Sequence, residues 1–190
     1  MLRRRAVPLF LVVSSLAAPL AAETLTFELD PAATRIEFTF GATLHTVNGS
    51  LRARQGTVQV DTGSGAASGW IVLDATSAQT GNSRRDRKMH EKILESRRFP
   101  DIVFDVQRVS GRLNRVGRSE LQVHGTLDFH GDRRPFALPV VAATEGDQVT
   151  ATGTVTVPYV EWGLRDPSFF LLRVEKEVRV TVKAAGRLTG

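Results

Sequence analysis

Hydrophobic and polar residues alternate along most of the chain after residue 22. A period of two is typical of strands that bury one face of a sheet. Turn-rich breaks such as residues 62–65 and 145–147 separate the alternating segments, and no strand–helix–strand rhythm appears. We therefore expect an all-β, antiparallel barrel or sandwich whose strands contain residues 24–29, 35–40, 57–61, 70–73, 102–106, 121–130, 136–140, 149–159 and 174–183.

One segment departs from this alternation. Residues 84–96 have the spacing of a helix, and Phe99-Pro100 ends it. Ser83 is the expected N-cap, and Asp86 lies three residues further on, as in a capping box. The sequence thus predicts one short helix inserted among many strands.

The N-terminus has the features of a secretory signal peptide. Arg3, Arg4 and Arg5 precede an apolar stretch over residues 9–20, and Ala21-Ala22 supplies small residues for cleavage. The apolar stretch is shorter than the roughly 20 residues that span a bilayer. We expect a signal peptide over residues 1–22 and one exported domain over residues 23–190. A retained anchor is the alternative, because Leu20 stands where a small residue is preferred.

Composition narrows the classes of function. The chain has 25 Lys and Arg against 20 Asp and Glu, and the predicted signal removes three arginines, which leaves 22 against 20, or +2. Bulk charge therefore does not favour nucleic-acid binding, and no basic patch interleaved with aromatics supports it. The absence of cysteine excludes thiol catalysis, cysteine-ligated zinc and iron–sulfur clusters.

Candidate catalytic and metal-binding residues are scattered. His90-Glu91 begins like a zinc-protease motif, but Leu94 occupies the place of the second histidine. The other histidines, His45, His124 and His130, lie in separate predicted elements. We therefore predict no metal and no cofactor. Convergence of two or three imidazoles on a metal is the alternative.

The apolar residues are those of a core or of a ligand cavity. Phe38, Phe40, Phe104 and Phe129 can all point inward, and Trp162 with residues 169–172 is expected to form a second apolar cluster. An eight-stranded barrel either fills its interior with side chains or holds one small ligand. Periodicity alone leaves both open.

Short motifs follow one another along the chain in a specific order and spacing. They are Asp30-Pro31, residues 35–38, residues 41–49, Thr80-Gly81-Asn82, Arg85-Asp86 with Met89-His90, residues 99–104 and His130-Gly131. On these motifs, from about residue 27 to 188, the chain resembles the YceI-like family of lipid- and polyisoprenoid-binding proteins. Two features depart from the family pattern: three residues separate Asp86 from His90, and residues 157–164 look like those of one branch of the family.

The resemblance implies a lipocalin-like antiparallel β-barrel of about eight strands, with the helix near its opening and an elongated apolar pocket. It also implies a periplasmic, non-enzymatic binding or carrier protein. The expected partners are a long-chain apolar or isoprenoid lipid and, transiently, a membrane. A polar head group would meet His45, His90 or Arg85. The predicted ligand-binding residues are Phe38, Phe40, His45, Arg85, Met89, His90, Phe104, Phe129 and Trp162.

Two other functions stay open at this point. One is a histidine-dependent metalloprotein or enzyme. The other is a packed barrel that acts as a stress-response adaptor through its outer face. The sequence does not choose between a monomer and a homodimer.

Overall fold

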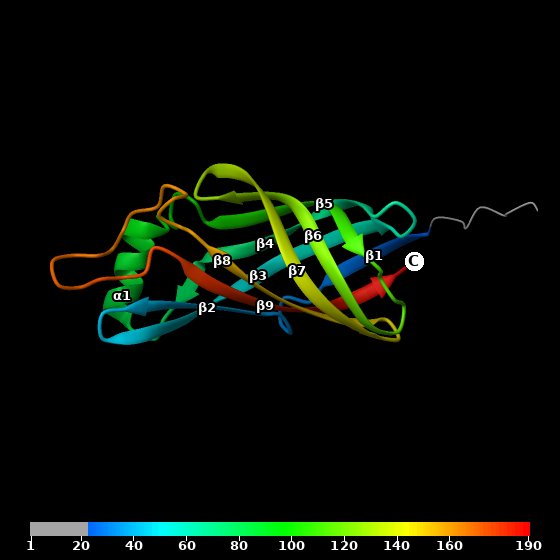
Figure 1. Cartoon of the computed structure of the whole chain (residues 1–190), viewed down its shortest axis with the longest axis horizontal. Coiled ribbons are helices and arrows are strands. Elements are labelled where there is room, and N and C mark those ends of the chain that lie inside the picture. The colour runs from blue at the N-terminus through cyan, green and yellow to red at the C-terminus, as the bar shows by residue number, and fades with distance from the viewer. Residues whose placement is uncertain (1–22) are drawn as a thin grey trace, which may run out of the picture.

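Residues 23–190, which the computed structural model describes, form an elongated barrel with a short helix at one end (Figure 1). The predicted signal peptide over residues 1–22 lies outside the described residues. The helical segment consists of α1 (Ser83–Lys88) and one π-helical turn, η1 (Met89–Ile93). The strands are β1 (Thr24–Leu29), β2 (Arg35–Ala42), β3 (His45–Asp61), β4 (Ala66–Gln79), β5 (Asp101–Gly111), β6 (Gly117–Phe129), β7 (Asp132–Glu145), β8 (Gln148–Val157) and β9 (Val178–Thr189).

The nine strands fill eight positions of a closed antiparallel barrel, because β1 and β2 lie end to end between the same two neighbours. β3 pairs with β2 through residues 45–51 and with β1 through residues 57–61. β9 pairs with β2 through residues 179–183 and with β1 through residues 186–189. β4 closes onto β3, and the other strands pair in chain order. The predicted all-β, lipocalin-like barrel of about eight strands is confirmed.

The break between β1 and β2 is a short turn that remains attached to the barrel. The Asp30 carboxylate accepts the backbone N–H groups of Ala32 and Ala33 at 2.9 and 3.1 Å. The Thr34 hydroxyl accepts the N–H of Ala185 on β9 at 3.1 Å. Asp30 thus satisfies the backbone groups that a strand would otherwise pair.

Several predicted strand boundaries are wrong: the strand predicted over residues 70–73 runs from Ala66 to Gln79, and the one predicted over residues 149–159 ends at Val157. Residues 57–61 are only the end of the 17-residue strand β3. Its inward positions include Gly49, Ala53 and Gly56, whose small side chains weaken the hydrophobic alternation. The last strand starts at Val178 instead of Val174, because Val174 makes only an isolated bridge to Ala42 in the β2–β3 hairpin.

The helix also begins and ends differently from the prediction. Asn82, not Ser83, is the N-cap, and its side chain accepts the N–H of Arg85 at 3.0 Å. Asp86 forms no capping box with Ser83, because its carboxylate accepts the N–H and hydroxyl of Thr80 at 2.9 and 2.5 Å. The helical segment ends at residue 93, before the predicted end at residue 96.

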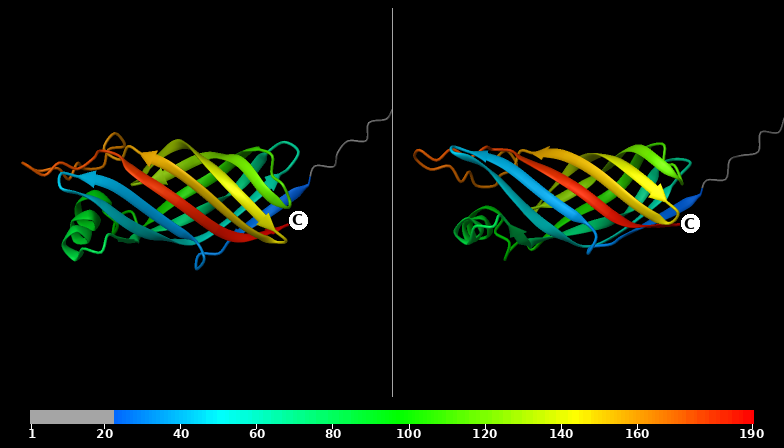
Figure 2. Two further views of the ribbon diagram at one scale, coloured as in Figure 1. Left: turned by 60° about the horizontal axis from the view of Figure 1, so that its bottom comes forward. Right: turned by 90° about the horizontal axis from the view of Figure 1, so that it is seen from below.

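Long connections gather at one end of the barrel, which we call the helix end (Figure 2). They are residues 80–100, which contain α1, and residues 158–177, between β8 and β9. The second connection is anchored by the buried Leu164 and by Tyr159, whose hydroxyl donates to the carbonyl of Glu175 at 2.7 Å. Burial, with a smaller contribution from the charge of Asp166, raises the pKa of Tyr159 to about 12, so this donor stays protonated.

Candidate ligand-binding site

The inward face of β6–β9 is apolar but incompletely packed. Strand register places Leu138 opposite Val123, and Val140 opposite Leu121 and Gly153. A filled core would bury such side chains completely. The apolar residues on this face that are only half-buried include Leu121, Val123, Phe136, Leu138, Val140, Val155, Val178, Val180 and Val182.

Two clusters of buried apolar residues lie in the barrel. One joins β3, β5 and β6 through Val58, Val60, Phe104, Val106, Val109 and Leu127. The other lies at the helix end and contains Val157, Tyr159 and Leu164. Among the described residues, Leu138, Val140 and Val182 pack against neither cluster. Apolar surface of β7 and β9 therefore lies outside both clusters.

An aromatic group joins the two clusters. Phe104 contacts Phe136 edge to face, with ring centroids 5.4 Å apart. Phe136 and Phe129 each contact Trp162, with centroids 6.4 and 6.3 Å apart. Three predicted ligand-binding residues, Phe104, Phe129 and Trp162, thus come together. The predicted cluster of Trp162 with residues 169–172 is wrong, because Trp162 packs here while residues 169–172 are exposed.

The sequence argument missed a cation in this group. The Arg134 guanidinium lies 4.9 Å from the centroid of the Trp162 ring and donates to the Trp162 carbonyl at 3.3 Å. It also pairs with Asp132 at 2.9 Å. Arg134 lies two residues before the inward-facing Phe136, so strand alternation alone could have placed it on the inward face. It is a polar group on the apolar lining.

Phe38 and Phe40 lie together on β2, away from the other aromatic residues. Their rings are stacked, with centroids 6.4 Å apart. The Phe38 ring lies against Gly49 on β3, where a Cβ atom would come within 2.2 Å of the ring. Gly49 thus leaves the space that the ring occupies.

Two depressions open on the barrel wall, and each includes an inward-facing glycine. One, of about 560 Å³, is lined by residues of β2, β3 and the end of β4, including Phe38 and Gly49. The other, of about 310 Å³, is lined by residues of β6, β7 and β8, including Val140 and Gly153.

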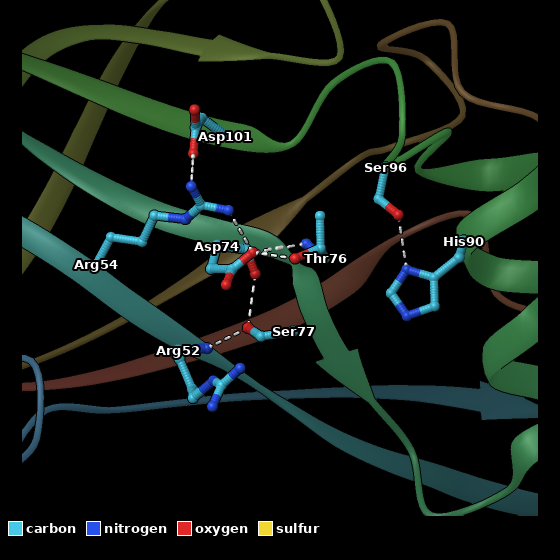
Figure 3. A network of polar contacts seen from close by, with 8 residues as sticks. All are labelled: Arg52, Arg54, Asp74, Thr76, Ser77, His90, Ser96 and Asp101. Atoms are coloured by element: carbon cyan, nitrogen blue, oxygen red, sulfur yellow. Dashed lines mark hydrogen bonds and ion pairs between the residues drawn. The ribbon is translucent and has the colours of Figure 1, made fainter.

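His90 attaches the helical segment to the barrel. Its Nδ1 lies 2.9 Å from the hydroxyl of the buried Ser96 (Figure 3), and its Nε2 lies 2.9 Å from the carbonyl of Ala78. Because a carbonyl only accepts, Nε2 carries the proton and the Ser96 hydroxyl donates to Nδ1. Both nitrogens are engaged, so the imidazole is structural, and its contact with a ligand stays a prediction.

The other polar residues predicted to meet a ligand are spread over the helix end. The Arg85 side chain donates to the Thr80 hydroxyl at 2.7 Å and to its carbonyl at 3.1 Å. Met89 is half-buried, and His45 is exposed at the start of β3. Geometry therefore does not bring His45, Arg85 and His90 together through any shared contact. Within residues 23–190, no group of three or more His, Asp or Glu side chains could hold a metal.

A polar network bridges β3, β4 and β5 on the outer wall (Figure 3). Arg54 pairs with Asp74 at 2.9 Å and with Asp101 at 3.3 Å. Burial of Asp74 acts to raise the pKa of its carboxyl, but hydrogen bonds from Thr76 and Arg54 outweigh burial and lower it. The network lies where the β3–β4 register shifts, so it stabilises an irregular stretch of sheet.

Comparison of the chain with known protein families identifies a family model of the YceI-like domain, which matches residues 27–185. The chain belongs to the YceI-like family. The resemblance inferred from the motifs is confirmed. No curated protein matches the chain in a direct comparison.

Several solved structures share the fold. BcnA of Burkholderia cenocepacia superposes with a TM-score of 0.67 at 16% identity, covering 83% of this chain and 98% of its own. A polyisoprenoid-binding domain from Saccharophagus degradans gives 0.62 at 16% identity, over 86% and 98% of the two chains. The YceI protein of Campylobacter jejuni gives 0.60 at 12% identity, over 76% and 86%. At such identities the likeness extends to the fold alone.

Proposed function

We propose that this protein binds a long apolar or isoprenoid lipid inside its barrel and carries it, without catalysis. The observation that supports this most directly is the half-buried apolar lining of β6–β9 between two packed clusters. Membership of the YceI-like family and the fold shared with a polyisoprenoid-binding domain point the same way.

The energetics of such a complex are favourable. Burial of an alkyl chain yields roughly 0.8 kcal/mol per CH₂ group, so a chain of about twenty carbons gains near 16 kcal/mol before the entropy of ordering is subtracted. A carrier of this kind needs few polar groups. Arg134 beside Trp162 is the side chain best placed to meet a polar head group, because it already lies on the inward face near the helix end.

The periplasm is the proposed location. Three arginines, an apolar stretch and Ala21-Ala22 have the order of a secretory signal peptide. N-terminal sequencing of the exported protein should find a mature chain that starts near Glu23. Recovery of a membrane-bound chain that retains Leu9 would contradict cleavage.

Filling the barrel tests the carrier function. Val140 faces inward and is half-buried, whereas Ala143 on the same strand faces outward and is exposed. Val140→Trp should displace the lipid, and Ala143→Trp should not. The measurement is mass spectrometry of organic extracts from each purified protein, followed by titration of the stripped proteins with a polyisoprenol.

Stability separates a hollow barrel from a filled one. Overpacking a filled core costs typically 1–3 kcal/mol. A hollow barrel accommodates the indole, so Val140→Trp should unfold at nearly the wild-type urea midpoint. If the variant is destabilised as a filled core would be, and wild type neither copurifies with lipid nor binds polyisoprenol, the carrier function is wrong.

A further inference from the structure

Four consecutive apolar residues form an exposed tip in the connection between β8 and β9. The exposed fractions are 81% for Phe169, 81% for Phe170, 76% for Leu171 and 47% for Leu172. Backbone hydrogen bonds of 2.9 and 2.8 Å between Phe169 and Leu172 close the tip, and Phe170 adopts a φ of 49° at its turn. We call residues 169–172 the apolar finger.

The base of the apolar finger is fixed to the barrel rim. The Arg173 N–H donates to the Thr43 hydroxyl at 2.6 Å, and the Thr43 N–H donates to the Arg173 carbonyl at 2.9 Å. The Glu175 N–H donates to the carbonyl of Gly41 at 2.9 Å. These contacts hold the finger beside the β2–β3 hairpin, whose Leu44 is 90% exposed.

Exposed apolar side chains are concentrated at this place. Seven large hydrophobic residues are exposed in the described part of the chain, and five of them are Leu44 and the finger. The other two, Trp70 and Val116, belong to β4 and to the β5–β6 turn. Figures 1 and 2 show that the finger projects beyond the helix and the β2–β3 hairpin at the helix end. A convex, projecting apolar tip is suited to insertion.

The helical segment adds positive charge at the same end. Residues 83–98 contain seven Lys and Arg against three Asp and Glu, a net charge of +4, whereas residues 23–190 as a whole carry +2. Most of these cations are exposed: Arg84, Arg87, Lys88, Lys92, Arg97 and Arg98. A basic surface at the same end of the barrel as an apolar tip is complementary to a bilayer with anionic head groups.

We propose that the helix end docks on an anionic lipid bilayer, with the apolar finger and Leu44 inserted among the acyl chains and the basic residues of 83–98 against the head groups. A bilayer is favoured over a second protein because a four-residue convex tip buries far less than the roughly 1,200 Å² of a stable protein interface. Within residues 23–190 no helix is long and apolar enough to cross a membrane. Docking goes beyond the proposed carrier function and does not depend on it.

Vesicle sedimentation tests the docking surface. The purified protein lacking residues 1–22 is mixed with vesicles of phosphatidylcholine and phosphatidylglycerol, and with vesicles of phosphatidylcholine alone. The double substitution Phe170→Ser and Leu171→Ser should weaken binding to the anionic vesicles at least about tenfold. Val116→Ser, at an exposed apolar residue outside the helix end, should leave it unchanged, and both variants should keep the wild-type unfolding midpoint.

The contribution of the basic residues and the insertion of the finger into the bilayer are tested separately. Lys88→Gln with Lys92→Gln should weaken binding to anionic vesicles and reduce its salt dependence. Because the chain contains no cysteine, a single Leu171→Cys can take an environment-sensitive dye, whose emission should shift to the blue on adding vesicles. The same dye at Val116→Cys should not respond.

Three results would overturn the proposal. Wild type that fails to sediment with anionic vesicles is one, and binding that survives the finger substitutions is another. The third is self-association in analytical ultracentrifugation that the finger substitutions abolish, which would make the finger an interface between two copies. Wild type that binds anionic vesicles but neither copurifies with lipid nor binds polyisoprenol would contradict only the carrier function.

Discussion

The two ends of the barrel differ in how their strands are connected. Away from the helix end, strands are joined by short turns at residues 62–65, 112–116 and 146–147. At the helix end, residues 80–100 and 158–177 form long connections that contain the helix, its exposed cations and the apolar finger. Because loops on a rigid scaffold usually carry function, we expect substitutions in the packed clusters of the barrel wall to change stability and those in the apolar finger to change membrane binding.

The largest effect should come from one substitution made in both regions. Phe104 is 9% exposed and packs edge to face on Phe136, whereas Phe170 in the finger is 81% exposed. Phe104→Ala should lower the free energy of unfolding by about 3–5 kcal/mol, because it leaves a cavity in a buried cluster. Phe170→Ala should change it by less than about 0.5 kcal/mol. Urea unfolding of the lipid-stripped proteins measures the free-energy loss in both variants. Equal losses would mean that the barrel wall and the finger do not differ in packing.

A medium effect is expected where the helix attaches to the wall. His90→Ala removes the partners of the Ser96 hydroxyl and the Ala78 carbonyl, which should lower stability by about 1–3 kcal/mol. His45→Ala, at an exposed imidazole, serves as the control. Hydrogen exchange should accelerate in residues 83–99 and not in the turns of the other end. Uniform acceleration throughout the barrel would mean that the helical segment is part of the same cooperative unit.

The smallest effect should appear as a pH dependence of the wall. Hydrogen bonds from Thr76 and Arg54 outweigh burial and lower the pKa of Asp74, so its ionised form stabilises the fold above the unfolded carboxyl pKa of about 3.9. That contribution is lost as pH falls through the lower, folded-state pKa. The stability difference between wild type and Asp74→Asn should therefore shrink below about pH 4. Asp147→Asn, at an exposed carboxylate, is the control. A difference constant down to acid unfolding would contradict the assignment.

Strand alternation predicted the barrel because a period of two is imposed by the sheet itself. It worked where β-branched and aromatic residues mark the inward face, as in β2 and β8. It failed for the first half of β3, where Gly49 and Ala53 occupy inward positions without a hydrophobic signal. The predicted helix N-cap was wrong because Asn82 and Ser83 are both residues that cap helices well. Only the contact of Asp86 with Thr80, which the sequence does not reveal, decides between them.

The site was less predictable than the fold. Alternation placed Phe104 and Phe129 inward. The contacts of Trp162 with Phe129, Phe136 and Arg134, however, depend on how the β8–β9 connection folds back onto the barrel. Hydrophobicity alone also assigned residues 169–172 to a core. A run of large apolar residues is ambiguous without knowing whether its segment packs or projects.

Because β1 and β2 lie end to end in one position of the barrel, the order in which the strands can fold is restricted. Both strands pair with β9, so their hydrogen bonds on that side join residues about 150 positions apart, such as Phe27 with Leu188 and Phe38 with Val180. Loop closure over that distance must precede any gain from these pairs, which makes ring closure late and comparatively slow. Until β9 arrives, β1, β2 and β8 each lack one neighbour, and the growing sheet has open edges. The meander from β4 to β8 has only local pairings, and it is the part that can form first.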